Sequence, residues 1–197
     1  MKLVIATCLL CFATNLSAQR LDIAALQSRC LPAASLDTLS AIIRVESGGN
    51  PNAMQIDFPK ALLKQWHLPP GSLRLKRQPV SQSEAVEWLN YFERHGIFVD
   101  LGLMQVSTAE AKRRGLSSES LLEPCFNLRV GWQILQDAYQ TEVMAYGPGQ
   151  QALDHAISRY NTGDTQRGID NGYLARVIAA LKQFPTTTLP FKGVDQR

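Results

Sequence analysis

Helical spacing of apolar residues recurs along most of this chain, and this pattern limits the folds that the chain can adopt. Leu36, Leu39 and Ile43 lie three and four residues apart, and Glu46 follows at the next helical step. Comparable stripes recur later in the chain, and they begin at Ala85, Ile134, Leu153 and Tyr173. No segment alternates apolar and polar residues regularly enough to predict a sheet. We therefore predict a mainly α-helical fold.

Capping residues mark the start of several predicted helices. Ser35 is placed to cap the helix that contains Glu46. Ser81 with Glu84 and Ser107 with Glu110 have the spacing of a capping box, in which the two side chains bond the free amides of the first turn. These patterns predict helix starts at all three serines.

Glu46 lies where a carboxyl group can become a proton donor. It shares a helical face with core-type side chains, and the segment 47–51, Ser-Gly-Gly-Asn-Pro, ends that helix. Burial and the negative end of the helix dipole both favour the neutral carboxyl group, so we predict a raised pKa. Such a group can protonate an ether-type oxygen near neutral pH. The alternative is a glutamate that turns outward and pairs at the surface with Arg44.

The N-terminus has the three parts of a cleavable secretory signal. Met1-Lys2 precedes an apolar run over residues 3–13, and small residues follow up to Ala18. The run is too short for a stable membrane span; the alternative is an uncleaved interfacial anchor. Residues after Phe184 show no pattern. The predicted division is a signal peptide at 1–18, one catalytic domain at 19–184 and a flexible tail at 185–197.

Two cysteines, Cys30 and Cys125, remain once the predicted signal is removed. In an exported chain two cysteines most simply form a disulfide. This bridge would close a long loop and stabilise the fold by up to about 4–5 kcal/mol on the chain-entropy model. The alternative is two separate buried thiols.

Charge and histidine placement exclude some classes of function. The formal net charge of +3 is too small to indicate nucleic-acid binding. His67, His95 and His155 each lack a second ligand at metal-binding spacing. We therefore predict no metal and no cofactor.

Two later segments carry groups that can bind a ligand. Gly102-Leu103-Met104-Gln105 places a glycine, where a backbone can approach a ligand closely, ahead of an amide. Tyr160-Asn161-Thr162-Gly163 places a phenol and an amide at the end of a helix. Each also has a purely structural interpretation, with Tyr160 in the core and Asn161 ending the helix. Tyr173, which opens the last predicted helix, can equally be a packing residue.

Taken in order, these motifs resemble those of the soluble lytic transglycosylase (SLT) catalytic domain, which has a lysozyme-like, goose-type helical fold. The resemblance runs from about Cys30 to Leu181. Further segments resemble the subgroup linked to type IV secretion and conjugative transfer, namely Arg77-Gln78-Pro79, Asp100–Gln105, Glu123–Leu128 and Ser158–Gly163. Ser107 replaces an asparagine that is frequent in the wider family, and Arg159 replaces a commoner alanine. These departures leave the sugar contacts less defined than the acid.

The resemblance implies non-hydrolytic cleavage of the β-1,4 bond between N-acetylmuramic acid and N-acetylglucosamine in peptidoglycan, which leaves 1,6-anhydro ends. It implies a periplasmic enzyme that opens the cell wall locally for a secretion or conjugation apparatus, with Glu46 as acid and then base. It also implies that Tyr160 orients Glu46 and that Met104 lines the groove. The sugar-binding set that it implies is Ser47, Gly102, Met104, Gln105, Tyr160 and Asn161.

Two alternative functions stay open on the sequence. A hydrolytic muramidase would use the same acid with an activated water, and most glycosidases need a second carboxyl group. Asp57 and Asp100 are candidates only through their proximity to the motifs in sequence. A non-catalytic glycan-binding component of a secretion apparatus is the other alternative, although pure binding gains little from a costly, partly buried acid.

Overall fold

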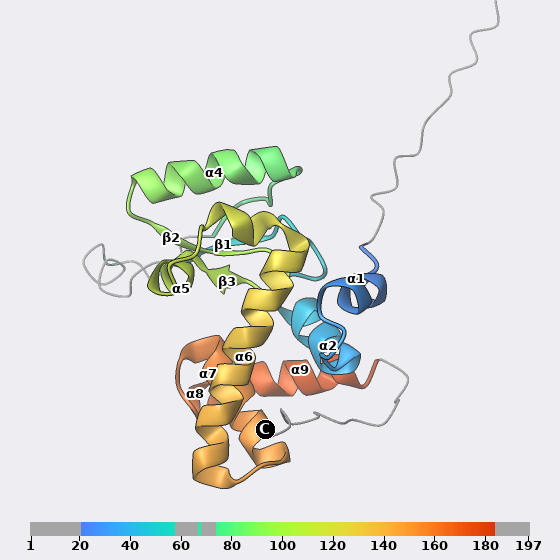
Figure 1. Ribbon diagram of the computed structural model, residues 1–197. Helices are drawn as coiled ribbons and strands as arrows, with labels where there is room; N and C mark the ends of the chain where they lie inside the picture. The colour runs from blue at the N-terminus through green and yellow to red at the C-terminus, as the bar shows by residue number, and fades with distance from the viewer. Residues whose placement is uncertain (1–20, 58–66, 68–73, 184–197) are drawn as a thin grey trace, which may run out of the picture.

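The computed structural model describes residues 21–57, 67 and 74–183, and over these residues it is mainly helical (Figure 1). The predicted fold class is therefore confirmed. The helices of this part of the chain are α1 (Ile23–Cys30), α2 (Leu36–Glu46), α4 (Gln82–Arg94), α5 (Thr108–Arg113), a 3-10 turn η1 (Glu119–Leu122), α6 (Pro124–Tyr146), α7 (Gln150–Thr162), α8 (Arg167–Asp170) and α9 (Tyr173–Leu181). The predicted signal peptide and tail lie outside the described residues. No helix within the described ranges has the length and apolar character to cross a membrane.

A small antiparallel sheet, which the sequence prediction missed, lies beside α4 and α5. Its three strands are ordered β1 (Met54–Asp57), β2 (Phe98–Leu101) and β3 (Val106–Ser107). They contain only four, four and two residues, too few for an alternating pattern to stand out. Gln55 pairs with Asp100, and Asp100 pairs with Ser107, so these three residues form one row across the sheet.

Helix α6 runs through the middle of the molecule and joins two groups of elements. The sheet, α4 and α5 lie toward its N-terminal end, and α7, α8 and α9 lie toward the other (Figure 1). The Glu123 carboxylate caps the start of α6, because it accepts hydrogen bonds from the amides of Cys125 and Phe126 at 3.0 and 2.6 Å. The predicted disulfide is confirmed, because Cys125 is bonded to Cys30 of α1 with the Cα atoms 5.3 Å apart.

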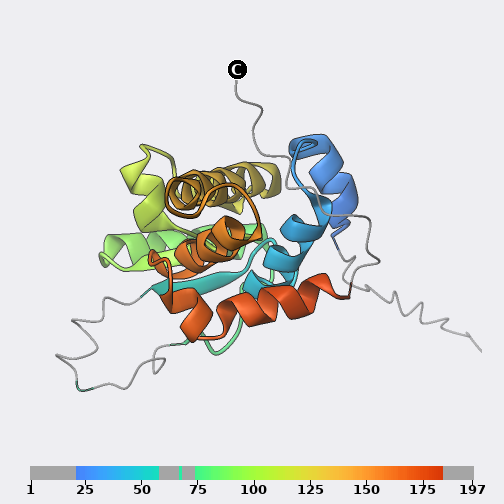
Figure 2. The same cartoon turned by 90° about the horizontal axis from the view of Figure 1, so that it is seen from below.

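Helices α2 and α9 pack against each other, and this contact positions the acid. Ser35 caps α2 as predicted, and Leu39, Ile42 and Ile43 are almost fully buried. Burying each of these side chains contributes roughly 1.5–3 kcal/mol. Helix α9 lies alongside α2 (Figure 2), so the end of the early helix meets the start of the last one.

Neither predicted capping box forms with both of its expected partners. Ser81 accepts from the amide of Glu84 at 3.2 Å, and the Glu84 carboxylate accepts from the amide of Val80 at 2.7 Å, so both side chains bond free amides at this helix start. Ser107 instead accepts from Ala109 at 3.2 Å. Glu110 does not bond the helix start and pairs with two arginines of its own helical region, since an ion pair competes for the same carboxylate.

Candidate active site

Glu46 is the last residue of α2, and the chain turns away directly after it. Gly48 and Gly49 have φ of +63° and +86°, values that favour glycine, so the helix cannot continue. The Ser47 hydroxyl donates to the carbonyls of Ile43 at 3.1 Å and Leu103 at 2.8 Å. The end of the helix is thereby attached to the segment that contains the Gly-Leu-Met-Gln motif.

The Glu46 carboxyl group accepts a hydrogen bond from the hydroxyl of Tyr173, the first residue of α9. Desolvation by the surrounding protein raises the pKa of Glu46 from 4.5 to about 7. The hydrogen bond from Tyr173 and the positive charge of Arg176 oppose that rise without cancelling it. The predicted direction of the pKa shift is confirmed, and the group can hold a proton near neutral pH.

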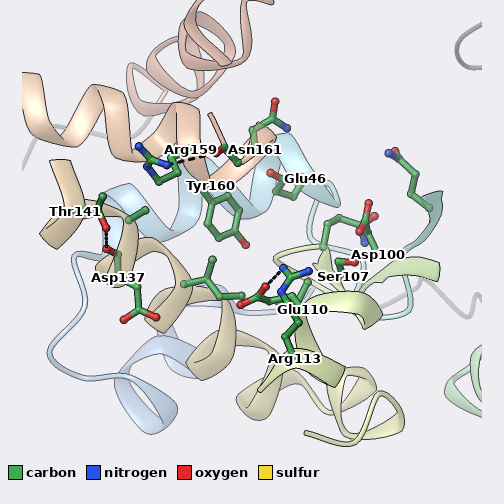
Figure 3. Close-up of a pocket in the computed structure, with 16 residues that line it drawn as sticks. Glu46, Asp100, Ser107, Glu110, Arg113, Asp137, Thr141, Arg159, Tyr160 and Asn161 are labelled. Atoms are coloured by element: carbon green, nitrogen blue, oxygen red, sulfur yellow. Dashed lines mark hydrogen bonds and ion pairs between the residues drawn. The ribbon is translucent and has the colours of Figure 1, made fainter. Parts of the chain in front are cut away.

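The Glu46 side chain lines a polar groove with a volume of about 600 Å³ (Figure 3). One side of the groove comes from the sheet and α5, and the other comes from α6 and the end of α7. The lining residues are Glu46, Gln55, Asp100, Gln105, Val106, Ser107, Glu110, Arg113, Ile134, Asp137, Ala138, Thr141, Arg159, Tyr160, Asn161 and Gly163. The acid therefore faces a polar surface that can hold a hydrophilic polymer.

The row across the sheet supplies part of this polar wall. Gln55, Asp100 and Ser107 all line the groove, and Asp100 is close enough to Tyr160 for its charge to raise the pKa of that phenol. Of the two sequence candidates for a second acid, Asp100 lines the groove, whereas Asp57 is not among its lining residues. The missed sheet is what brings Asp100 to the groove.

The turn over residues 102–105 is held by hydrogen bonds to Asn127, which is buried in the first turn of α6. The Asn127 side chain accepts from the Met104 amide at 2.8 Å and donates to the carbonyls of Leu101 and Leu121 at 2.8 and 2.9 Å. Gly102 has a φ of +75°, and a Cβ atom there would lie 2.5 Å from Asn127. Glycine is therefore required by close packing at this turn.

The predicted sugar-binding residues divide into two groups. Gln105, Tyr160 and Asn161 line the groove. Ser47, Gly102 and Met104 are absent from its lining, and the Met104 side chain is fully buried against Gly131. The prediction that Met104 lines the groove is therefore wrong, because this part of the motif builds the turn that presents Gln105.

The tyrosine that contacts Glu46 also differs from the prediction. The Tyr160 hydroxyl donates to the Met104 carbonyl at 2.6 Å, and Tyr173 makes the hydrogen bond to Glu46. Burial, followed by the charges of Glu46 and Asp100, raises the Tyr160 pKa well above its usual value, so this phenol stays neutral. Tyr173 has the helix-opening position noted in the sequence, but no local pattern indicates its contact with a residue so far away along the chain.

No group of three or more acidic, histidine or cysteine side chains is arranged to hold a metal ion within residues 21–57, 67 and 74–183.

Comparison with known proteins identifies the family of this chain. The family model described as "Transglycosylase SLT domain" matches residues 26–171, which include Glu46, the turn at 102–105 and the end of α7. The chain therefore belongs to the transglycosylase SLT domain family. No solved structure gives a significant match.

Curated relatives connect the chain with a narrower group. It is 32% identical over 162 residues to "Type IV secretion system protein virB1" of Brucella suis biovar 1, which covers 79% of this chain and 62% of the relative. It is 32% identical over 163 residues to "Protein virB1" of Agrobacterium fabrum, which covers 82% of this chain and 60% of the relative. The chain thus spans about three fifths of the length of these relatives.

Proposed function

We propose that this protein is a peptidoglycan lytic transglycosylase that cleaves the β-1,4 bond between N-acetylmuramic acid and N-acetylglucosamine. The observation that carries the proposal is Glu46, a carboxyl group with a pKa of about 7 at a polar groove. The family match supports the reaction class. A group with this pKa can donate a proton near neutral pH and accept one later in the same cycle.

Glu46 acts twice in the proposed reaction. Its proton passes to the glycosidic oxygen as the bond to C1 of the muramoyl residue breaks. The resulting carboxylate then accepts the proton of the C6 hydroxyl, whose oxygen bonds to C1 and closes the 1,6-anhydro ring. Because Oε1 accepts the hydrogen bond from Tyr173, Oε2 is the oxygen left to carry the proton. No water is consumed, and Glu46 returns to its protonated form.

Binding holds the sugars in line with this acid. Gln105, Tyr160 and Asn161 are proposed to contact the glycan strand, since they line the groove from two sides. The Gln105 amide is fixed by donating to the carbonyls of Ala53 and Gly102 at 3.1 and 2.9 Å. A rigid groove of this kind lowers the barrier by holding the C6 hydroxyl close to C1.

The test is mass spectrometry of the soluble products that the purified protein releases from peptidoglycan. Anhydro-muropeptides, lighter by one water than hydrolytic products, are expected from the unmutated protein and not from Glu46→Gln. Glu87→Gln is the matched control, because Glu87 is exposed on α4 and is not among the lining residues of the groove. Equal release by Glu46→Gln and the unmutated protein would show that Glu46 is not the acid.

A hydrolytic muramidase is the second candidate, and the position of Asp100 favours it. Asp100 lines the same groove as Glu46, and a second carboxylate is what hydrolysis of a glycoside usually requires. Products with reducing ends, abolished by Asp100→Asn as well as by Glu46→Gln, would establish this alternative. Glycan binding without any product would instead favour a non-catalytic component of an assembly.

The type IV secretion context is part of the proposal and is supported by the name of the Brucella suis relative. We place the mature protein in the periplasm, where it would open peptidoglycan for assembly of the apparatus. Expression of this chain in a Brucella suis strain that lacks its own VirB1 tests the role. Restored secretion by the unmutated chain and not by Glu46→Gln is expected, and sequencing of the mature N-terminus would test the predicted signal cleavage.

A further inference from the structure

Arg159 lines the groove but has no role in the proposed proton transfers of Glu46. It comes from the last turn of α7, directly before Tyr160, and its side chain is 34% exposed. It lines the same groove as Glu46. A guanidinium group at this place is a strong, permanently charged donor that faces the polymer.

A buried carboxylate fixes the direction of this arginine. Glu142 of α6 is only 2% exposed, and its Oε1 accepts from Arg159 Nε at 2.5 Å. Its Oε2 accepts from the Thr165 hydroxyl at 2.9 Å. Burying a carboxylate is costly unless it is paired and hydrogen-bonded, and here both oxygens have partners. The pair holds the guanidinium at the groove wall.

The guanidinium group keeps donors that the protein does not use. A guanidinium has five N–H donors, of which Nε–H bonds to Glu142. Nη1 makes a long contact of 3.4 Å with the Gly163 carbonyl. Among the described residues no acceptor bonds to Nη2. The side chain can therefore offer two amino groups to a planar, doubly accepting group such as a carboxylate.

Different side chains line the two ends of the groove. Figure 3 shows Arg159 and Thr141 toward one end and Asp100 and Ser107 toward the other, with Tyr160 between them. Of the acids toward this end, Asp164 bonds to the amides of Gln166 and Arg167, and Asp137 bonds to Arg114 at 2.7 Å. The unused donors of Arg159 therefore favour binding of an anionic group of the polymer at this end of the groove.

We propose that Arg159, held by Glu142, forms a subsite that binds a carboxylate of the peptidoglycan strand. This inference rests on the proposed function and specifies its substrate class as the carboxylate-bearing strand. Peptidoglycan has two sources of such a group, the stem peptides and the lactyl group of muramic acid once the peptide is removed. Arg159 makes the enzyme select where on a strand it binds, while Glu46 performs the proton transfers.

The competing explanation is that the arginine only joins α6 to α7. Such a structural role would change stability and the binding of every ligand together, whether or not the ligand carries charge. A carboxylate subsite would instead change binding only when the carboxylate is present. The two explanations therefore separate when protein and ligand are altered in one cycle.

The experiment measures dissociation constants in the Glu46→Gln background, so that the strand is not cleaved. The ligands are glycan strands with stem peptides, strands stripped of peptides by an amidase, and both kinds after chemical conversion of their carboxylates to amides. The proteins are the background, Arg159→Gln, and Arg159→Gln combined with Glu142→Gln. The combined variant removes the unpaired buried charge that the single substitution leaves, and thermal melting verifies that it is folded.

Amidation of the ligand is expected to weaken binding to the background protein about tenfold and to leave both arginine variants unaffected. An effect seen only with peptide-bearing strands identifies the stem peptide, and an effect that persists with stripped strands identifies the lactyl group. An equal effect of amidation on all three proteins would overturn the subsite. Absence of binding to any strand by the background protein would instead count against the proposed function itself.

Discussion

Two glutamates of this protein are shielded from water, but their carboxyl groups have different hydrogen-bond partners. Glu46 at the end of α2 meets the hydroxyl of Tyr173, and its pKa rises to about 7. Glu142 within α6 is 2% exposed and bonds to a guanidinium and a hydroxyl. The first is the proposed acid of the reaction, and the second pairs with Arg159.

The difference shows that the partner, together with desolvation, decides what a shielded carboxyl group can do. A phenol stabilises a carboxylate only modestly, so desolvation still dominates at Glu46 and the proton is retained. A guanidinium supplies a full positive charge, so Glu142 forms an ion pair. The four predictions below test this contrast.

Glu46→Gln should have the largest effect. Product release is expected to fall at least about a thousandfold, because the amide cannot transfer the proton. The folded state should be no less stable, since a desolvated carboxyl group is removed. Initial rates of product release and thermal melting provide the measurements. A residual rate above about one hundredth of the original, with no contaminating enzyme, would contradict the assignment of the acid.

Arg159→Ala should lower the free energy of unfolding by about 3 kcal/mol, because it leaves Glu142 buried without its positive partner. Urea denaturation at neutral pH measures this loss. Arg113→Ala is the control, since the Arg113 side chain is 69% exposed and pairs with Glu110 at the surface. That change should cost less than about 1 kcal/mol. Equally small losses of unfolding free energy in both variants would show that Glu142 tolerates removal of its ion-pair partner.

The pH dependence of stability should separate the two glutamates further. The Glu46 carboxyl keeps its proton to higher pH in the folded chain, with a pKa of about 7 against the ordinary 4.5. Its contribution to stability is therefore fully present below about pH 4.5 and is lost as the pH rises through 7.

Glu46→Gln should consequently gain about 2–3 kcal/mol over the unmutated protein above about pH 8 and little at pH 4. Denaturation curves at the two pH values measure the difference. Glu87→Gln on the exposed face of α4 should show no such trend. A Glu46→Gln advantage that is equal at both pH values would contradict the raised pKa.

Tyr173→Phe should have the smallest effect. The lost hydrogen bond favoured the charged form of Glu46, so its pKa should rise further and the alkaline limb of the rate profile should move to higher pH. The rate at neutral pH should fall about tenfold as orientation is lost. Tyr160→Phe is the comparison, because its hydroxyl donates to Met104 and its alkaline limb should stay in place. A limb that moves with Tyr160→Phe instead would reverse the two assignments.

Local patterns were sufficient to predict the acid and the helix that holds it. The spacing of Leu39, Ile43 and Glu46, with Ser35 before them and two glycines after them, is contained within a few helical turns. Capping, burial and helix termination all act over this distance, so they can be predicted from the local sequence. The disulfide, although long-range, was predictable on another basis, namely the predicted export signal and the number of cysteines that remain after it.

The other long-range contacts were not predictable. Tyr173 and Tyr160 both follow helical spacing, and only the packing of α9 on α2 decides which hydroxyl meets Glu46. The sheet that carries Asp100 was missed because two-to-four-residue strands have no period to detect. Met104 and Gly102 stand in a motif with Gln105, yet they build the turn while Gln105 lines the groove, a division that one-dimensional spacing does not contain.

The hydrogen bond between Glu46 and Tyr173 joins residues 127 positions apart. Its two partners are therefore synthesised at different times. A chain made from its N-terminus contains the acid early, while the phenol that binds it is among the last residues of the domain. A nascent or C-terminally shortened chain that ends before α9 therefore holds Glu46 without the helix that shields and orients it. The hydrogen bond to Glu46 can therefore form only after α9 has been synthesised and has docked on α2.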